Sequence, residues 1–240
     1  MAPNLEKKDG SLPDVVILCG GLGRRISSVV ADVPKPLAAI GGISFLDILL
    51  KQIFDQGFQK VILAVGHMGE KIVEKYPNDS RISFSVEDAP LGTGGAVINA
   101  LGKIESEHFI VMNGDSYCDI DLFEFYKKHK EAGSLLSIVV AKIDDASDRG
   151  SICIGDDSRI ISFEEKTSEK SEGLINAGIY AMKKEIAEIA PGKKNFSLEY
   201  DLFPAAIESF CYGHIVSAEV LDIGTPERYE LAKKILGKEK

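Results

Sequence analysis

The sequence predicts an α/β protein with a mixed, mostly parallel, Rossmann-like sheet and helices on both of its faces. Through about residue 142, short apolar runs typical of buried strands alternate with stretches typical of helices. Hydrophobic residues make up 45% of the 240 residues, which is enough for the core of one such domain. We therefore expect a flexible polar tail over residues 1–13 and a single domain over residues 14–240.

The first half of the chain supplies this alternation. The clearest helix signal begins at Ser44, which is the expected N-cap, with Asp47 at the third helical position. Gly57 is expected to end that helix. Apolar or alternating runs predict strands over residues 15–19, 60–66, 81–88, 108–115 and 134–143. Helices are expected between them over residues 44–57, 92–101 and 121–133.

The second half is less regular. Two short apolar runs on either side of residues 155–158 predict a β-hairpin, and a strand is expected over 174–182. Ser197 is an expected N-cap for a helix over 197–209. Pro226 favours the start of a last helix over 224–236, with lysines near its end.

Charge and composition argue against several classes of protein. Proteins that bind nucleic acid in general are basic, whereas this chain has a net charge of −9. No nucleic-acid partner is therefore expected. The four cysteines lie far apart without a CxxC pair, which argues against a zinc site. The first residues lack an apolar signal segment, and no apolar run reaches the length of a membrane span. We expect a cytoplasmic protein without a membrane partner.

Polar clusters follow several of the expected strands. In an open α/β sheet, ligands bind at the carboxyl ends of the strands, so these clusters are the candidate site. They comprise residues 20–25, 87–95, 113–115 and 222–224.

The segment ILCGGLGRRISSVVADVPKPL, residues 17–37, combines a glycine turn with separated cations. It lacks the third glycine of a dinucleotide fingerprint and contains no Walker loop, so a plain turn remains an alternative. The glycines would let backbone N–H groups approach a polyphosphate, while Arg25 and Lys35 add positive charge. Pro34 and Pro36 restrict the backbone beside Lys35. This arrangement suits a triphosphate whose α-phosphate is attacked and whose β,γ part leaves.

The pattern GGxGxR followed by PKP resembles the signature of the sugar-1-phosphate nucleotidylyltransferases, with Arg24 at the usual Thr position. That family joins a nucleoside triphosphate to a sugar 1-phosphate and releases pyrophosphate. The resemblance extends from about residue 15 to 236 through further ordered motifs: EDAPLGTGGA, NGD, FEEK, NAGIY and DIGTPERY. Within the family, SLEYDLFP and the spacing of the other motifs are most similar to the D-glycero-α-D-manno-heptose 1-phosphate guanylyltransferases.

The resemblance implies a nucleotide-binding half at about residues 14–142 and a sugar-phosphate-binding half at 143–240. It assigns catalysis to Arg25, Lys35 and Asp115, and Mg²⁺, with Mn²⁺ as an alternative, to Asp115 and Asp222. Taken singly, either aspartate could equally be a turn or cap residue. The implied nucleotide-binding residues are Leu18, Gly20, Gly21, Gly23, Arg24, Glu87, Gly92, Thr93, Gly94 and Asn113, and the implied sugar-phosphate-binding residues are Glu165, Lys166, Asn176 and Gly178.

The implied reaction transfers GMP from GTP to a heptose 1-phosphate for surface-glycan biosynthesis, such as lipopolysaccharide or capsule. A carboxylate at Glu87 could accept hydrogen bonds from the N1–H and N2–H₂ edge of guanine, which uracil lacks. Two alternatives remain open: a uridylyl-, cytidylyl- or thymidylyltransferase acting on a hexose or amino-sugar phosphate, and a non-catalytic regulatory subunit that binds a nucleotide-sugar. A homo-oligomer is compatible with the sequence.

Overall fold

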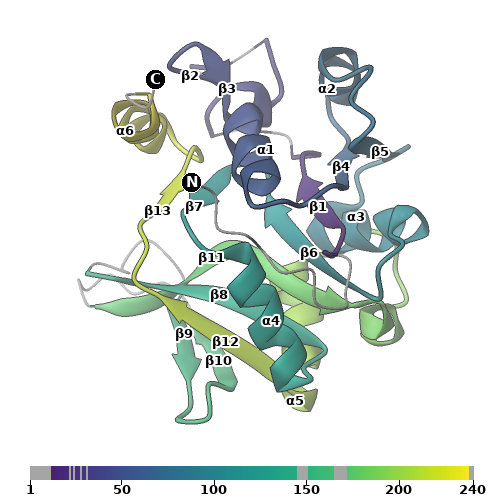
Figure 1. Cartoon of the computed structure of the whole chain (residues 1–240), viewed down its shortest axis with the longest axis vertical. Helices are drawn as coiled ribbons and strands as arrows, with labels where there is room; N and C mark the ends of the chain where they lie inside the picture. Colours follow the sequence, from purple (N-terminus) through teal and green to yellow (C-terminus); the bar gives the residue numbers. More distant parts are fainter. Residues whose placement is uncertain are drawn as a thin grey trace.

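The computed structural model describes residues 12–21, 23, 25–27, 29–30, 32–144, 151–164 and 172–237. These residues form a nine-stranded sheet (Figure 1). Its parallel part runs in the order β5, β4, β1 and β6, which span Ile82–Val86, Val61–Val65, Val15–Leu18 and His108–Asn113. Val15 is paired with Val61 on one side and with Ile110 on the other.

Beyond β6 the sheet becomes mixed. The long strand β11 (Gly173–Lys183) lies antiparallel between β6 and β8 (Leu136–Ile143). β12 (Cys211–Val216) then pairs with β8 in parallel. The expected hairpin is confirmed as β9 (Ser151–Ile154) and β10 (Ile160–Glu164), which are antiparallel. Two short sheets complete the described strands: β2 (Ala39–Ile40) with β3 (Ile43–Ser44), and β7 (Ser116–Cys118) with β13 (Val220–Asp222).

Helices cover both faces of the large sheet, which confirms the predicted fold class. Successive strand residues alternate between two cores: Val15 and Ile17 belong to one, and Val16 to the other. The first core packs against α1 (Phe45–Asp55), α2 (Gly69–Lys75), α4 (Leu122–Ala132) and α6 (Pro226–Leu236). The second packs against α3 (Gly92–Ala100) and α5 (Phe203–Ser209). No helix in the described ranges is long and apolar enough to cross a membrane.

The expected helix caps are present. Ser44 and Asp47 form a reciprocal capping box at the start of α1. The Ser197 side chain accepts from the N–H groups of Glu199 and Tyr200 at a π-helical turn, η4 (Leu198–Leu202), which continues into α5. Thr225 caps α6 at Pro226. The sequence did not predict α2, β7, β12 or β13, nor the 3₁₀ turns η1 (Lys35–Leu37), η2 (Leu101–Lys103) and η3 (Lys184–Ile189).

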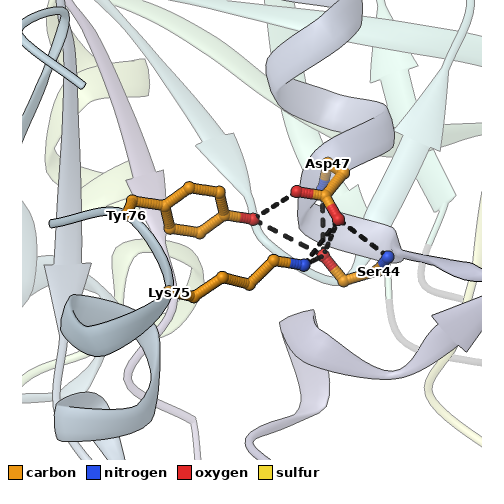
Figure 2. Close-up of polar contacts among 4 residues, drawn as sticks. All are labelled: Ser44, Asp47, Lys75 and Tyr76. Carbon is orange, nitrogen blue, oxygen red and sulfur yellow. Dashed lines mark hydrogen bonds and ion pairs between the residues drawn. The ribbon is translucent and has the colours of Figure 1, made fainter. Parts of the chain in front are cut away.

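A polar network fixes the start of α1 to the end of α2 (Figure 2). Asp47 accepts from Lys75 at 2.5 Å and from the Tyr76 hydroxyl at 2.7 Å, and Lys75 also donates to Ser44 Oγ at 2.7 Å. Burial alone would raise the pKa of Asp47, but the hydrogen bonds from Lys75, Ser44 and Tyr76 outweigh it and lower that pKa. The β2–β3 hairpin just before α1 is thereby anchored, and η1 with Lys35 directly precedes that hairpin.

Candidate active site

A cleft of about 640 Å³ opens beside the carboxyl ends of β1 and β6. This is where a ligand is expected to bind to an open α/β sheet. Most of the residues that the sequence singled out line it: Leu18, Gly20, Gly21, Arg25, Lys35, Glu87, Gly92, Thr93, Asn113, Asp115, Asn176, Gly178 and Asp222. Gly23 and Gly94 are described but do not line the cleft. Arg24, Glu165 and Lys166 lie outside the described residues.

The glycine turn after β1 forms one wall of the cleft. Gly21 is exposed, and no atom beyond its chain neighbours would lie within 4 Å of a Cβ placed on it. Its backbone is therefore open to a ligand. Arg25 is exposed and lines the same cleft. Lys35 is further in, with only 13% of its side chain exposed, between the buried Pro34 and Pro36.

The two aspartates come from distant parts of the chain and meet here. Asp115 follows β6 and directly precedes β7, and Asp222 ends β13. The β7–β13 pairing sets Asp222 opposite Ser116, and the Ile223 N–H donates to the Asp115 carbonyl at 3.0 Å. The short two-stranded sheet is thus what brings the aspartates together.

Each aspartate contacts a cation of the chain. Lys35 Nζ lies 2.5 Å from Asp115 Oδ2, and Arg228 Nη1 lies 3.0 Å from Asp222 Oδ2. Asp222 Oδ1 also accepts from the Gly224 N–H at 2.9 Å. The described residues contain no group of three or more His, Cys, Asp or Glu that could hold a metal. Two carboxylates nevertheless suit Mg²⁺, because that ion usually completes its shell with water and phosphate oxygens.

Glu87 lies where the glycine turn meets the loop before α3. A Cβ on Gly20 would be 2.6 Å from Glu87 Oε1, so the carboxylate rests against that turn. Glu87 Oε2 accepts from the Leu91 N–H at 3.1 Å. Burial raises the pKa of Glu87, and the Leu91 hydrogen bond opposes this.

Leu91 and the first turn of α3 are hydrogen-bonded to the segment before η4. The Phe196 carbonyl accepts from the Gly94 N–H at 3.0 Å, and the Phe196 N–H donates to the Leu91 carbonyl at 2.9 Å. A Cβ on Gly94 would lie 2.2 Å from Phe196 Cε2. The close packing of Phe196 thus explains why a glycine is needed at position 94. The sequence predicted instead that Gly94 contacts the nucleotide.

Gly94→Ala is expected to destabilise the fold by about 1–3 kcal/mol, because the buried Phe196 ring must move to admit the methyl group. Urea unfolding of the variant measures this. Gly102→Ala in η2 is the control, since no atom beyond its chain neighbours lies within 4 Å of its added Cβ, and it should leave the midpoint nearly unchanged. Equal midpoints for the two variants would contradict this packing role.

The opposite wall is built by a bulge in β11. The register of β11 against β8 shifts between Asn176 and Tyr180, and Gly178 has φ +76°, a left-handed conformation suited to glycine. Asn176 Oδ1 accepts from the Gly178 N–H at 2.8 Å, and Asn176 Nδ2 donates to the Tyr180 hydroxyl at 2.9 Å. Asn176 and Gly178 are two residues apart on β11, and both line the cleft.

Several cleft residues were not singled out from the sequence. Glu199 lines the cleft from η4, and although its side chain is exposed, desolvation by the surrounding chain together with the negative charge of Asp115 raises its pKa. Arg228 lines it from the first turn of α6. Both lie inside motifs that carried the family resemblance, SLEYDLFP and DIGTPERY, so the motifs were signals for them. The remaining ones are Ser116, Ile175, Asn195 and Val220, whereas Cys19, Pro36, Pro90, Ala96, Gly114 and Gly224 belong to segments that the sequence had indicated.

The fold and the cleft together define a class of α/β protein. In this class a glycine turn, two cationic side chains and two carboxylates line one ligand-binding cleft. The chain belongs to the nucleotidyl transferase family, whose model matches residues 14–239. This membership confirms both the predicted family and the prediction of a nucleotidyltransferase.

Similar proteins cover nearly the whole chain. It is 36% identical to the D-glycero-α-D-manno-heptose 1-phosphate guanylyltransferase of Aneurinibacillus thermoaerophilus over 227 residues, which is 93% of this chain and 98% of that protein. The protein of the same name from Campylobacter jejuni is also 36% identical, over 89% of this chain and 96% of its own. The crystal structure of HddC from Yersinia pseudotuberculosis complexed with GMP-PN has a TM-score of 0.83 and 38% identity, and the match covers 94% and 100% of the two chains.

Proposed function

We propose that this protein transfers GMP from GTP to D-glycero-α-D-manno-heptose 1-phosphate, releasing pyrophosphate. The product would serve surface-glycan biosynthesis in the cytoplasm. The observation that supports this most is the shared cleft: it joins the glycine turn, Lys35 and both aspartates to the Asn176–Gly178 bulge. The near full-length similarity to two proteins named as heptose 1-phosphate guanylyltransferases supports the choice of base and sugar.

The proposed reaction is one in-line displacement. A phosphate oxygen of the sugar 1-phosphate forms a bond to the α-phosphorus of GTP, while the bond from that phosphorus to the α,β-bridging oxygen breaks. Pyrophosphate leaves with the electron pair. The attacking phosphate is already an anion at neutral pH, so no general base is needed, and catalysis consists of positioning and charge stabilisation.

The residues of the cleft divide into two groups. The open backbone of Gly21, with Arg25 and Lys35, would hold the triphosphate by hydrogen bonds and charge. Asn176 and Glu199, on the opposite wall, offer an amide and a carboxylate to sugar hydroxyls. Asp115 and Asp222 would hold Mg²⁺ or Mn²⁺, which when bound supplies positive charge against the negative charge on the phosphates.

Glu87 is the proposed reader of guanine. Its carboxylate lies in the cleft against Gly20, and a carboxylate can accept from the two neighbouring donors on the guanine edge. The hydrogen bond from the Leu91 N–H holds one of its oxygens in place. Uracil and thymine do not offer that pair of donors, so the same contact would discriminate against UTP and dTTP.

A pyrophosphate-release assay with four nucleoside triphosphates and a panel of sugar 1-phosphates tests this function. We expect the highest kcat/KM with GTP and the heptose 1-phosphate. Glu87→Gln should lower kcat/KM for GTP by about tenfold or more, as for loss of one base-edge contact. Asp88→Asn, an exposed neighbour, is the control and should have little effect.

Two results would contradict the proposal in different ways. A preference for another nucleotide or for a hexose phosphate would keep the chemistry but overturn the assigned base or sugar. Absence of pyrophosphate release with every pair would overturn the catalytic role itself and favour a regulatory subunit that binds a nucleotide-sugar.

A further inference from the structure

The two aspartates of the cleft are each paired with a cation of this chain. Lys35, in η1, forms an ion pair with Asp115. Arg228, in α6, forms an ion pair with Asp222. The Arg228 contact is made to both oxygens of Asp222, at 3.0 and 3.3 Å from Nη1. The family resemblance assigns Lys35 to the phosphates, whereas Arg228 was not among the predicted site residues.

Lys35 also approaches the second aspartate. A Cβ placed on Gly224 would lie 2.9 Å from Asp222 Oδ1 and 3.6 Å from Lys35 Nζ. The ammonium group that binds Asp115 and the carboxylate of Asp222 therefore both lie near Gly224. The exposed fractions of the side chains are 13% for Lys35 and 38% for Asp115 in one pair, and 25% for Arg228 and 15% for Asp222 in the other. Both pairs are partly shielded from water, and a partly shielded ion pair is stronger than one on an open surface.

Charge balance adds to this argument. The two carboxylates carry two negative charges, and Lys35 and Arg228 carry two positive ones. The four side chains together are neutral, so the charge of each aspartate is already balanced by a cation of the chain. A further carboxylate near Asp115 is that of Glu199. A triphosphate brings several negative charges and oxygen ligands of its own into the same cleft, and it can accept hydrogen bonds from an ammonium and a guanidinium.

We propose that Lys35 and Arg228 keep the aspartate pair closed to a free divalent ion until a triphosphate draws these cations onto its phosphates. This inference rests on the proposed function, because it takes the triphosphate as the ligand. Arg228 is then a positioning residue that holds Asp222 in place and determines when the pair accepts a metal. Because binding coupling is reciprocal, the metal and the triphosphate must each strengthen the binding of the other.

Manganese binding to the full chain without substrate tests the proposal, with the EPR signal of free Mn²⁺ as the readout. The wild type should bind Mn²⁺ weakly alone and much more tightly with an α,β-methylene analogue of GTP. Arg228→Met removes the charge but keeps an apolar stem, and it should tighten binding of Mn²⁺ alone by about tenfold or more. Lys35→Met should do the same.

Two control variants distinguish the proposed role of Arg228 from a general effect of net charge on Mn²⁺ binding. Arg228→Lys keeps a cation near Asp222 and should bind Mn²⁺ alone as weakly as the wild type. Arg159→Met removes the same charge elsewhere, at a residue bonded to the Ser209 carbonyl, and should also leave Mn²⁺ binding unchanged. Circular dichroism and urea unfolding check that each variant is folded.

Weaker or unchanged Mn²⁺ binding in folded Arg228→Met would overturn the proposal, as would equally tight Mn²⁺ binding to the wild type with and without the GTP analogue. Pyrophosphate release by the wild type is measured in parallel. Pyrophosphate release without a gain in Mn²⁺ affinity on binding of the GTP analogue would contradict only this inference and leave the proposed function intact. A gain in Mn²⁺ affinity with the GTP analogue but no pyrophosphate release would support the proposed closure of the aspartate pair and contradict the proposed function.

Discussion

Asp115→Asn is expected to lower kcat by on the order of 10²-fold or more, with the fold intact, because it removes one carboxylate of the proposed catalytic pair. Asparagine has nearly the same shape but no charge, so it would hold neither Lys35 nor a divalent ion as the aspartate does. The Ile223 contact to residue 115 uses the backbone carbonyl, which the substitution retains. The β7–β13 pairing should therefore survive.

Steady-state pyrophosphate release at saturating substrates measures this effect. Asp119→Asn is the matched control, because Asp119 follows β7, is exposed and does not line the cleft. Its kcat should stay within about twofold of the wild type, as for most surface changes. A near-normal kcat in Asp115→Asn would remove this residue from the catalytic machinery.

Arg25→Ala is expected to lower kcat by a similar factor, on the order of 10². The charge that leaves with pyrophosphate grows in the transition state, so a guanidinium beside the glycine turn should matter more there than for ground-state binding. Arg25→Lys keeps the charge but loses the planar set of donors, and it should recover only part of the rate.

Single-turnover kinetics with saturating GTP separate this loss of rate from weaker binding. Arg81→Ala is the control, since that arginine is exposed and paired with Asp79 away from the cleft. If Arg25→Ala raised KM for GTP while kcat stayed unchanged, Arg25 would be a binding residue that does not act on the transition state.

The local signals in the sequence were sufficient for much of this structure. The capping box at Ser44, the cap at Ser197, Pro226 at the start of α6 and the β9–β10 hairpin all depend on residues close together in the chain. The order of the motifs along the chain then indicated a family, and among the residues that the structure describes, residues from each of those motifs except FEEK line one cleft.

Long-range pairing could not be predicted in this way. Hydrophobic alternation shows that β11 is a strand, but it does not show that β11 lies antiparallel between β6 and β8. The short strands β7 and β13 gain their stability from pairing with each other, and neither has a clear pattern alone. Gly94 illustrates the same limit, because Phe196, which requires a glycine there, lies far along the chain.

The most direct test of the central claim is a crystal structure of the protein with Mn²⁺ and the α,β-methylene analogue of GTP, with the anomalous signal locating the metal. We expect one manganese peak at about 2.2 Å from carboxylate oxygens of both Asp115 and Asp222, with Arg25 and Lys35 on the phosphates. A metal bound to the nucleotide without either aspartate, or phosphates remote from Arg25 and Lys35, would contradict the account.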